Sequence, residues 1–302
     1  YDHLAHLRGL AWCKRMNVPA FLYVDSNIHG DDPTPSRRAV KKRLIPWLYR
    51  RTRAIFVFGS CGRKFYERYG VPGEHCVYCP MEPDYAQIDA VTEADVEAAR
   101  AAHGLSAERK RFMFCARMTQ VKRPDLLIDA FVAIAQQRPD WDVLMVGEGP
   151  LRQGLMARVP EALRPRVIWT GFVSDQRRIS ALYRASHALV LPSDYEPWAL
   201  VVNEAAAAGL PIVATSVVGA AAELVKDGVN GRTIPPGDVA ALQEALLEIS
   251  APGASDRLGE GSRRVLAQWR AEADPVRQMT AALRRAGVGV EVQPGEASET
   301  GD

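Results

Sequence analysis

The sequence predicts an α/β protein built from two parallel sheets of the doubly wound type, each covered by helices. Short apolar runs alternate with segments of helical length, which is the pattern of βαβ units. The alternation occurs twice, with a polar and acidic stretch between the two sets. At 302 residues, the chain is also long enough for two domains with separate cores.

The first set of elements is short. We predict a helix over 4–16, strands over 18–24, 54–60 and 76–79, a basic helical segment over 37–53 and a helix over 61–69. A doubly wound domain has about six strands, and the chain begins at Tyr1 without a methionine. We therefore expect residues 1–90 to be a partial domain and the chain to be a fragment.

The second set is long enough for a complete doubly wound domain. Strands are predicted over 112–116, 143–146, 167–170, 188–191, 212–214 and 231–234. Helices fit near 124–137, 150–158, 175–185, 197–208, 219–226 and 238–249. We expect a linker over 91–110, this domain over 111–260, one C-terminal helix over 261–287 and a disordered tail over 288–302, which is rich in Gly, Glu, Ser and Thr.

The composition is that of an ordinary globular protein, and the net charge of +2 favours no particular partner. We predict no nucleic-acid partner. No run approaches the ~18–20 apolar residues that span a bilayer, and no signal peptide is recognisable, so we expect a cytoplasmic location. The five cysteines are scattered, which favours a reducing compartment. Cys76, Cys79 and His75 lack a second ligand pair and surround a strand, so we predict no metal site.

Residues 37–53 form a strongly basic segment without an acidic residue, in which Leu44, Trp47 and Leu48 are apolar. Two interpretations are open. The pattern favours a solvated basic helix with one buried face, and the alternative is peripheral contact with the inner face of a membrane or with an anionic acceptor. Pro46 interrupts the pattern and weakens the case for a single interfacial helix.

Glu196 and Glu204 lie eight positions apart, directly after the predicted strand over 188–191. Pro197 suits the first turn of a helix, so Glu196 would stand before a helix N-terminus, where phosphate also binds. Glu204 would lie ~12 Å further along that helix. Such a pair can bracket an extended ligand. On spacing alone, two solvated surface glutamates are the commoner arrangement, but this helix lies between two apolar strands.

Arg117 follows the first strand of the second set, and Lys122 lies at the start of the next helix. A guanidinium and an ammonium at one strand's carboxyl end make a clamp for a diphosphate. A solvated basic loop is the alternative. Glycine turns end the next two strands, at Gly147-Glu148 and at Gly171-Phe172-Val173. Such turns let the backbone approach a ligand, but they also simply connect βα units.

These motifs together resemble the retaining glycosyltransferases of family 4. The resemblance is strong over about residues 110–250 and loose over the first 85 residues. It rests on Ala116-Arg117, Lys122-Arg123-Pro124, Val146-Gly147-Glu148-Gly149-Pro150, Gly171-Phe172-Val173, Glu196-Pro197-Trp198, Leu200-Val201, Glu204-Ala205, Gly209-Leu210-Pro211 and Glu223-Leu224-Val225.

The resemblance implies a GT-B fold, in which two Rossmann-like domains face a cleft. It implies that Arg117 and Lys122 grip the donor diphosphate and stabilise the departing charge. Glu196 matches the glutamate beside the donor sugar, and Glu204 the one that binds the ribose. The backbone N–H groups of Trp198, Ala199 and Leu200 would bind the phosphates. The residues of the glycine turns would line the donor, namely Gly147, Glu148, Gly171 and Val173.

The resemblance further implies a UDP- or GDP-linked sugar as the donor, no cofactor and no metal. The acceptor would be a glycan, a lipid-linked molecule or a small molecule. This chain departs from the family at Ala199, where glycine is usual, and in the N-terminal histidine near the sugar, for which His3, His6 and His29 are candidates by location only. The alternative is a truncated homologue that binds nucleotide sugars without catalysis.

Overall fold

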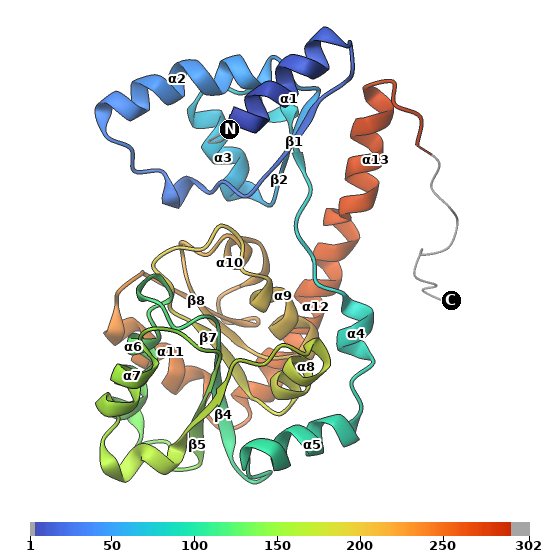
Figure 1. Cartoon of the computed structure of the whole chain (residues 1–302). Coiled ribbons are helices and arrows are strands. Elements are labelled where there is room, and N and C mark those ends of the chain that lie inside the picture. Colours follow the sequence, from blue (N-terminus) through green and yellow to red (C-terminus); the bar gives the residue numbers. More distant parts are fainter. Residues whose placement is uncertain (1–3, 291–302) are drawn as a thin grey trace.

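A computed structural model describes residues 4–290 of the chain. Within them, two parallel sheets with flanking helices form two units, one above the other in the view of Figure 1. The sequence-based expectation of two sets of alternating strands and helices is confirmed. The predicted disordered tail lies outside the described residues from position 291 onward.

The N-terminal unit has a three-stranded parallel sheet in the order β1-β2-β3, within the described residues. Its strands are β1 (Phe21–Val24), β2 (Ala54–Val57) and β3 (Cys76–Tyr78), and its helices are α1 (Leu4–Arg15), α2 (Pro35–Tyr49) and α3 (Ser60–Arg68). Apolar residues of α2 and α3 pack on one face of the sheet, among them Ile45, Phe65 and Tyr66. The helix α2 continues through Pro46 and contains residues 37–49 of the basic segment, whereas residues 50–53 lie after its end.

The second face of this sheet is covered by the end of the chain. The single helix expected over 261–287 is wrong, because two helices occupy this region: α12 (Ala254–Ala273) and α13 (Pro275–Arg285). Asp274 separates them, and Pro275 begins α13, since a proline cannot continue the hydrogen bonding of the preceding helix. The chain then returns to the N-terminal unit, where Ala282 and Met279 pack with Phe56 and Val77. Figure 1 shows α13 beside the upper unit.

The C-terminal unit has a six-stranded parallel sheet in the order β6-β5-β4-β7-β8-β9, within the described residues. Its strands are β4 (Lys110–Cys115), β5 (Trp141–Val146), β6 (Val167–Gly171), β7 (Ala188–Leu191), β8 (Ile212–Thr215) and β9 (Gly231–Ile234). The α-helices before, between and directly after them are α4 (Tyr85–Asp89), α5 (Glu93–His103), α6 (Pro124–Ile134), α7 (Arg152–Arg158), α8 (Gln176–Arg184), α9 (Leu200–Ala208), α10 (Gly219–Leu224) and α11 (Val239–Ile249). The predicted linker over 91–110 therefore contains α5, whose residues Val96 and Ala99 pack into the C-terminal core.

The strand order reverses between β4 and β7, which are adjacent although three helices and two strands separate them in sequence. Their register pairs Phe112 with Ala188 and Met113 with Leu189. In open parallel sheets, ligands bind in the crevice outside the carboxyl ends of the strands at such a reversal. The residues that follow β4 and β7 are therefore the first place to look for a site.

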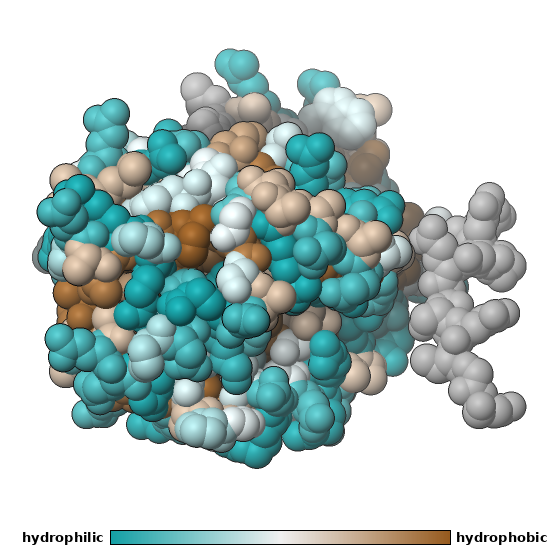
Figure 2. Space-filling model, turned by 90° about the horizontal axis from the view of Figure 1, so that it is seen from below, coloured by the Kyte–Doolittle hydropathy of each residue, from teal (hydrophilic) through white to brown (hydrophobic). Residues whose placement is uncertain are grey.

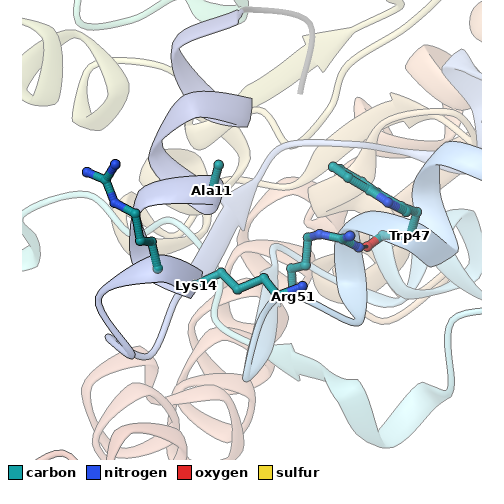
Figure 3. Close-up of a pocket in the computed structure, with 5 residues that line it drawn as sticks. Ala11, Lys14, Trp47 and Arg51 are labelled. Atoms are coloured by element: carbon teal, nitrogen blue, oxygen red, sulfur yellow. Dashed lines mark hydrogen bonds between the residues drawn. The ribbon is translucent and has the colours of Figure 1, made fainter.

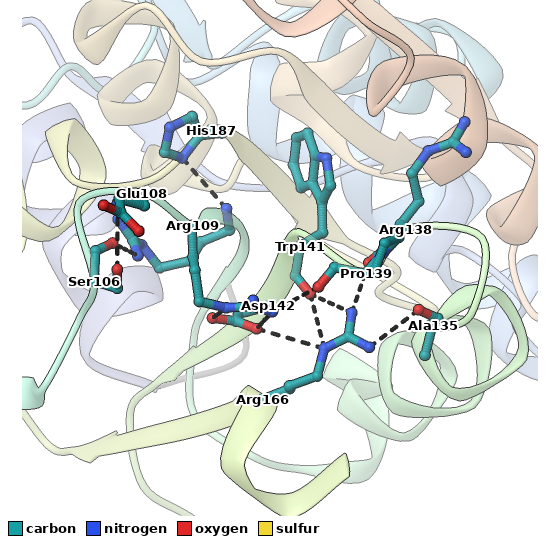
Figure 4. Close-up of polar contacts among 11 residues, drawn as sticks. Ser106, Glu108, Arg109, Ala135, Arg138, Pro139, Trp141, Asp142, Arg166 and His187 are labelled. Atoms are coloured by element: carbon teal, nitrogen blue, oxygen red, sulfur yellow. Dashed lines mark hydrogen bonds and ion pairs between the residues drawn. The ribbon is translucent and has the colours of Figure 1, made fainter.

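The opposite edge of the same sheet carries a network of ion pairs and hydrogen bonds (Figure 4). The guanidinium of Arg109 donates to both carboxylate oxygens of Asp142, at 2.7 and 2.6 Å. Arg166 donates to the carbonyl oxygens of Trp141 and Ala135. This network ties the start of β5 to the end of α6 and to the segment before β6. It lies away from the crevice and serves stability.

His187, beside this network, makes the stability of the fold depend on pH. Its Nδ1 accepts the backbone N–H of Arg111 at 3.3 Å. Burial, with Arg111 and Lys110 nearby, lowers the pKa of His187 to about 4. Because the unfolded chain binds this proton first as the pH falls, the free energy of unfolding should drop between about pH 6.5 and pH 4, by up to ~3 kcal/mol. Urea denaturation over this range measures the drop. His187→Asn, which keeps an acceptor for Arg111, should flatten it, and an equal slope in both proteins would contradict the assignment.

Figure 2 shows a mainly hydrophilic surface, with smaller hydrophobic patches between the polar side chains. Among the described helices, none is both long enough and apolar enough to cross a bilayer.

Candidate active site

The structure brings three predicted site residues to the crevice between β4 and β7. Arg117 follows the end of β4, and Lys122 ends a short 3-10 helix over Gln120–Lys122. Glu196 lies in the loop between β7 and α9. Strands that pair in parallel end at the same edge of the sheet, so residues far apart in sequence meet there.

Glu196 is the most constrained of the three. Its side chain is 7% exposed, and its Oε2 lies 2.5 Å from the Nζ of Lys122, whose side chain is 25% exposed. Ser193 Oγ donates to Oε1 of Glu196 at 3.1 Å, and Thr215 Oγ1 donates to the carbonyl of Ser193 at 2.5 Å. The carboxylate is thus held by a cation on one oxygen and a hydroxyl on the other.

The two loops that carry Lys122 and Glu196 are also bound to each other. The backbone N–H of Asp194 donates to the carbonyl of Val121 at 2.8 Å. Arg123 forms ion pairs with Asp125, at 3.0 Å, and with Asp194, at 3.3 Å. These contacts fix the backbone on both sides of the Lys122–Glu196 pair. The pair is therefore a built feature of the loops and not a chance surface contact.

Arg117 differs from Lys122 because its side chain is exposed. Among residues 4–290, no hydrogen bond or ion pair of its guanidinium is found. Of the two cations after β4, Arg117 is therefore free to meet an anionic ligand, while Lys122 is bound to Glu196.

The predicted helix over 197–208 is wrong at its start, since α9 begins at Leu200. Ala199 precedes it with a φ of 86° and a ψ of 84°, in the left-handed region. Pro197 therefore lies in the loop and not in the first turn. The expected separation of ~12 Å along a helix between the two glutamates no longer applies. In the described chain, the N–H groups of Trp198, Ala199 and Leu200 donate no hydrogen bond and remain available at a helix N-terminus.

The backbone conformation at position 199 should suit glycine better than the alanine that is present. A non-glycine residue in the left-handed region costs about 1–3 kcal/mol, which a glycine would relieve. Glycine also gives the unfolded chain more conformational freedom, and this offsets part of the gain. We expect Ala199→Gly to raise the free energy of unfolding by about 1 kcal/mol, as measured by urea denaturation. The control is Ala207→Gly within α9, which should lower it by about 1 kcal/mol. Destabilisation by both substitutions would contradict the strain at Ala199.

Glu204 is buried in α9, where Gln176 Nε2 donates to its Oε1 at 3.1 Å. Burial raises the pKa of this carboxyl, and hydrogen bonds lower it in part. A buried carboxylate with one amide partner keeps acceptor capacity for hydroxyl groups of a ligand. The interpretation of the two glutamates as solvated surface residues is wrong, because both are buried.

The glycine turns bring the ends of β4, β5 and β6 together. The N–H of Gly147 donates to the carbonyl of Gly171 at 3.0 Å. A Cβ on Gly147 would lie 2.2 Å from the carbonyl oxygen of Ala116. Glu148 is exposed and pairs with Arg152 at 3.5 Å, and Val173 is partly buried after β6. The turns therefore lie beside Arg117, and a role in donor binding stays a prediction.

Three residues at the site escaped the sequence reasoning. Ser193 and Gln176 hold the two glutamates, and Asn27 reaches Glu196 from the N-terminal unit. Their neighbours in sequence carry no distinctive motif. A buried amide in a polar loop is a signal only once its partners are known.

The remaining candidates from the sequence are the histidines of the N-terminal unit and the two cysteines at β3. His29 is exposed overall, and partial desolvation of its ring, with Lys64 and Arg68 nearby, lowers its pKa. His6 lies in α1, and His3 lies outside the described residues. Cys76 and Cys79 are buried free thiols at β3, and burial raises the pKa of each to about 11. Over residues 4–290, no group of three or more His, Cys, Asp or Glu side chains could hold a metal ion.

Residues 109–251 match the family model described as glycosyl transferases group 1. A D-inositol 3-phosphate glycosyltransferase of Geodermatophilus obscurus is 28% identical over 282 residues, which are 88% of this chain and 61% of that protein. A glycogen synthase of Mycobacterium tuberculosis is 32% identical over 215 residues, which are 67% of this chain and 50% of that protein. The chain thus spans 61% and 50% of the length of these two relatives, less than two thirds of either.

Solved structures decide the fold. Anabaena Alr3699/HepE in complex with UDP is 20% identical, with a TM-score of 0.74 over 93% of this chain and 75% of that chain. WaaG, a glycosyltransferase involved in lipopolysaccharide biosynthesis, is 18% identical, with a TM-score of 0.67 over 93% of this chain and 82% of that chain. The fold is GT-B. In this GT-B chain, the crevice of the C-terminal unit faces the N-terminal unit, and the candidate site lies between them.

Proposed function

We propose that this GT-B chain transfers a sugar from a nucleotide-diphosphate sugar to an acceptor with retention of anomeric configuration, as a hexosyltransferase of family 4. One observation carries the proposal. Buried Glu196 forms an ion pair with Lys122 at the carboxyl edge where β4 meets β7, and Arg117, which follows β4, has no side-chain partner among the described residues. A site with a carboxylate for a sugar and two cations for a diphosphate suits this donor.

In the proposed reaction, the bond between the sugar C1 and the diphosphate oxygen breaks, and a bond between C1 and the acceptor oxygen forms on the same face. Negative charge grows on the leaving diphosphate, which also takes the proton of the acceptor hydroxyl. Arg117 and Lys122 would stabilise that charge, in place of a metal ion. Glu196 would orient the sugar ring, once the diphosphate competes for Lys122.

The other donor contacts follow from the same pose. The free N–H groups before α9 would bind the phosphates, and Glu204 would accept hydrogen bonds from the ribose. Gly147, Glu148, Gly171 and Val173 would line the nucleotide. The donor would be UDP- or GDP-linked, and the similar fold of HepE was solved as a complex with UDP.

The acceptor would be a glycan, a lipid-linked molecule or a small molecule in a cytoplasmic setting. The second candidate function is binding of a nucleotide sugar without transfer. The intact Lys122–Glu196 geometry favours catalysis over that alternative.

A panel of nucleotide sugars tests the proposal. UDP- and GDP-sugars are screened by thermal shift, since a ligand at about 100 times its Kd adds ~2.7 kcal/mol. Donors that bind are then incubated with and without EDTA, and the released nucleotide and the anomer of the product are followed by NMR. Release of the nucleotide with a retained anomer, unaffected by EDTA, is expected. Binding without any release would support the second candidate, and no binding would refute both.

We also propose that the N-terminal unit docks on an anionic membrane surface through α1 and α2. Neither helix contains Asp or Glu. Figure 3 shows a hollow between their ends, lined by Lys14, Arg15 and Arg51 with Trp47. The guanidinium of Arg51 stacks 3.5 Å from the ring centre of Trp47. Exposed aromatic rings among cations suit a layer of anionic headgroups.

Sedimentation with vesicles tests this docking. The chain should sediment with phosphatidylcholine vesicles that contain phosphatidylserine, should remain in solution with phosphatidylcholine alone, and should be released by salt. Lys14→Glu with Arg15→Glu should weaken sedimentation, whereas Arg178→Glu on α8 should not. Equal sedimentation of both variants would contradict docking through this face.

A further inference from the structure

The loop after β1 crosses from the N-terminal unit to the candidate active site. Asn27 lies in this loop and is only 2% exposed. Its Nδ2 donates to the carbonyl of Glu196 at 3.0 Å and to the carbonyl of Val217 at 3.4 Å. Its Oδ1 accepts the backbone N–H of His29 at 2.9 Å. One end of this amide therefore fixes its own loop, and the other end holds the backbone at Glu196.

Other contacts also hold the backbone around Glu196, among them its isolated parallel bridge with Val218 and the hydrogen bond from the N–H of Asp194 to Val121. The segment from Pro192 to Ala199 lies outside regular structure and ends at the strained Ala199. The carbonyl of Glu196 accepts one further hydrogen bond, from the N–H of Gly219 at 3.2 Å. In such a segment, a buried side chain that bonds the backbone takes the place of a regular ladder. Asn27 thus holds the residue whose carboxylate faces Lys122.

Asn27 acts within a wider contact between the two units. A Cβ on Gly30 would lie 2.4 Å from the ring of Tyr195, so this loop packs closely on the neighbour of Glu196. Elsewhere, Glu223 Oε1 accepts the N–H of Ser60 at 2.7 Å, without touching Glu196. Phe58 also reaches the candidate catalytic loop, where its ring lies edge-on to that of Trp198, with ring centres 6.4 Å apart. The hydrogen bonds of Asn27 act on the backbone of Glu196 itself, whereas the Ser60–Glu223 hydrogen bond does not touch Glu196 and can serve as the control.

We propose that Asn27 is a positioning residue, which couples the seating of the N-terminal unit on the C-terminal unit to the orientation of Glu196. The inference rests on the proposed function of Glu196. When the units are in contact, the Asn27 amide fixes the Glu196 carbonyl, and the carboxylate points at Lys122. When that contact is lost, the donor is still bound by the C-terminal unit, but the sugar is no longer oriented.

Two variants of Asn27 test the coupling by kinetics. Asn27→Asp keeps the size and the Oδ1 acceptor but turns a carboxylate oxygen toward the Glu196 carbonyl, and Asn27→Ala removes all three hydrogen bonds of the side chain. We expect kcat to fall about 10- to 100-fold in each, with the KM for the donor and the Kd for UDP changed less than about twofold. Glu223→Ala, which opens the interface away from Glu196, should lower kcat less than about threefold. An unchanged kcat in the Asn27 variants, or an equal loss in Glu223→Ala, would overturn the proposal.

Hydrogen exchange separates this proposal from the proposed function. Amide exchange over residues 193–199 should accelerate about tenfold or more in Asn27→Ala and remain as in the wild-type chain in Glu223→Ala. This readout needs no turnover. If the wild-type chain transfers no sugar but the exchange differs as expected, then the proposed function fails and the positioning by Asn27 stands. Unchanged exchange in Asn27→Ala would overturn the positioning itself.

Discussion

Arg117→Ala should lower kcat for sugar transfer by about 10²- to 10³-fold with little change in stability. The guanidinium has no partner among the described residues, so its removal breaks no internal contact, while the charge on the leaving diphosphate loses a donor. Glu196→Gln keeps the size of the side chain but removes the charge that pairs with Lys122, and should lower kcat to a similar extent. Steady-state rates with the donor identified by thermal shift measure both effects.

The control for Arg117 is Arg178→Ala, which removes an exposed arginine of α8 on the same unit. It should leave kcat unchanged. Arg117→Lys keeps the charge but loses the planar fork, and should recover only part of the rate. Wild-type rates in both Arg117→Ala and Glu196→Gln would contradict the catalytic assignment.

The residues that form the crevice were predictable because they follow strands whose apolar runs are readable. In parallel sheets, each strand ends at the same edge, so Arg117 and Glu196 could be placed together from sequence alone. The adjacency of β4 and β7 decides how close they come. It is a property of strand order, which a single sequence does not show directly.

The start of α9 and the position of α13 could not be predicted from the sequence. Nothing in the composition of Pro197-Trp198-Ala199 shows that Ala199 adopts a positive φ, because alanine is the best helix former. The helix α13 is amphipathic, but only the tertiary structure shows that its apolar face covers Phe56 and Val77 of the first sheet. Asn27 is similar, since its partners are backbone carbonyls some 170 positions away.

Gly147→Ala should be among the most damaging single substitutions in the chain. Gly147 has a φ of 125°, which L-residues rarely adopt, and an added Cβ would lie 2.2 Å from the carbonyl oxygen of Ala116. Ala116 and Gly147 directly follow the paired strands β4 and β5, so neither residue can move away without breaking hydrogen bonds between these strands. We expect the free energy of unfolding to fall by about 3 kcal/mol or more, as measured by urea denaturation.

The same substitution at Gly154 provides the matched control. Gly154 lies in α7 without a positive φ, and no atom lies within 4 Å of its added Cβ. Gly154→Ala should therefore raise the free energy of unfolding by about 0.5–1 kcal/mol. Because Ala116 precedes Arg117, the Gly147 variant should also lose nucleotide affinity wherever it remains folded, whereas the Gly154 variant should keep it. Equal stability of the two variants would show that the ends of β4 and β5 can separate. The close approach of Gly147 to Ala116, beside Arg117, would then not be needed to shape the site.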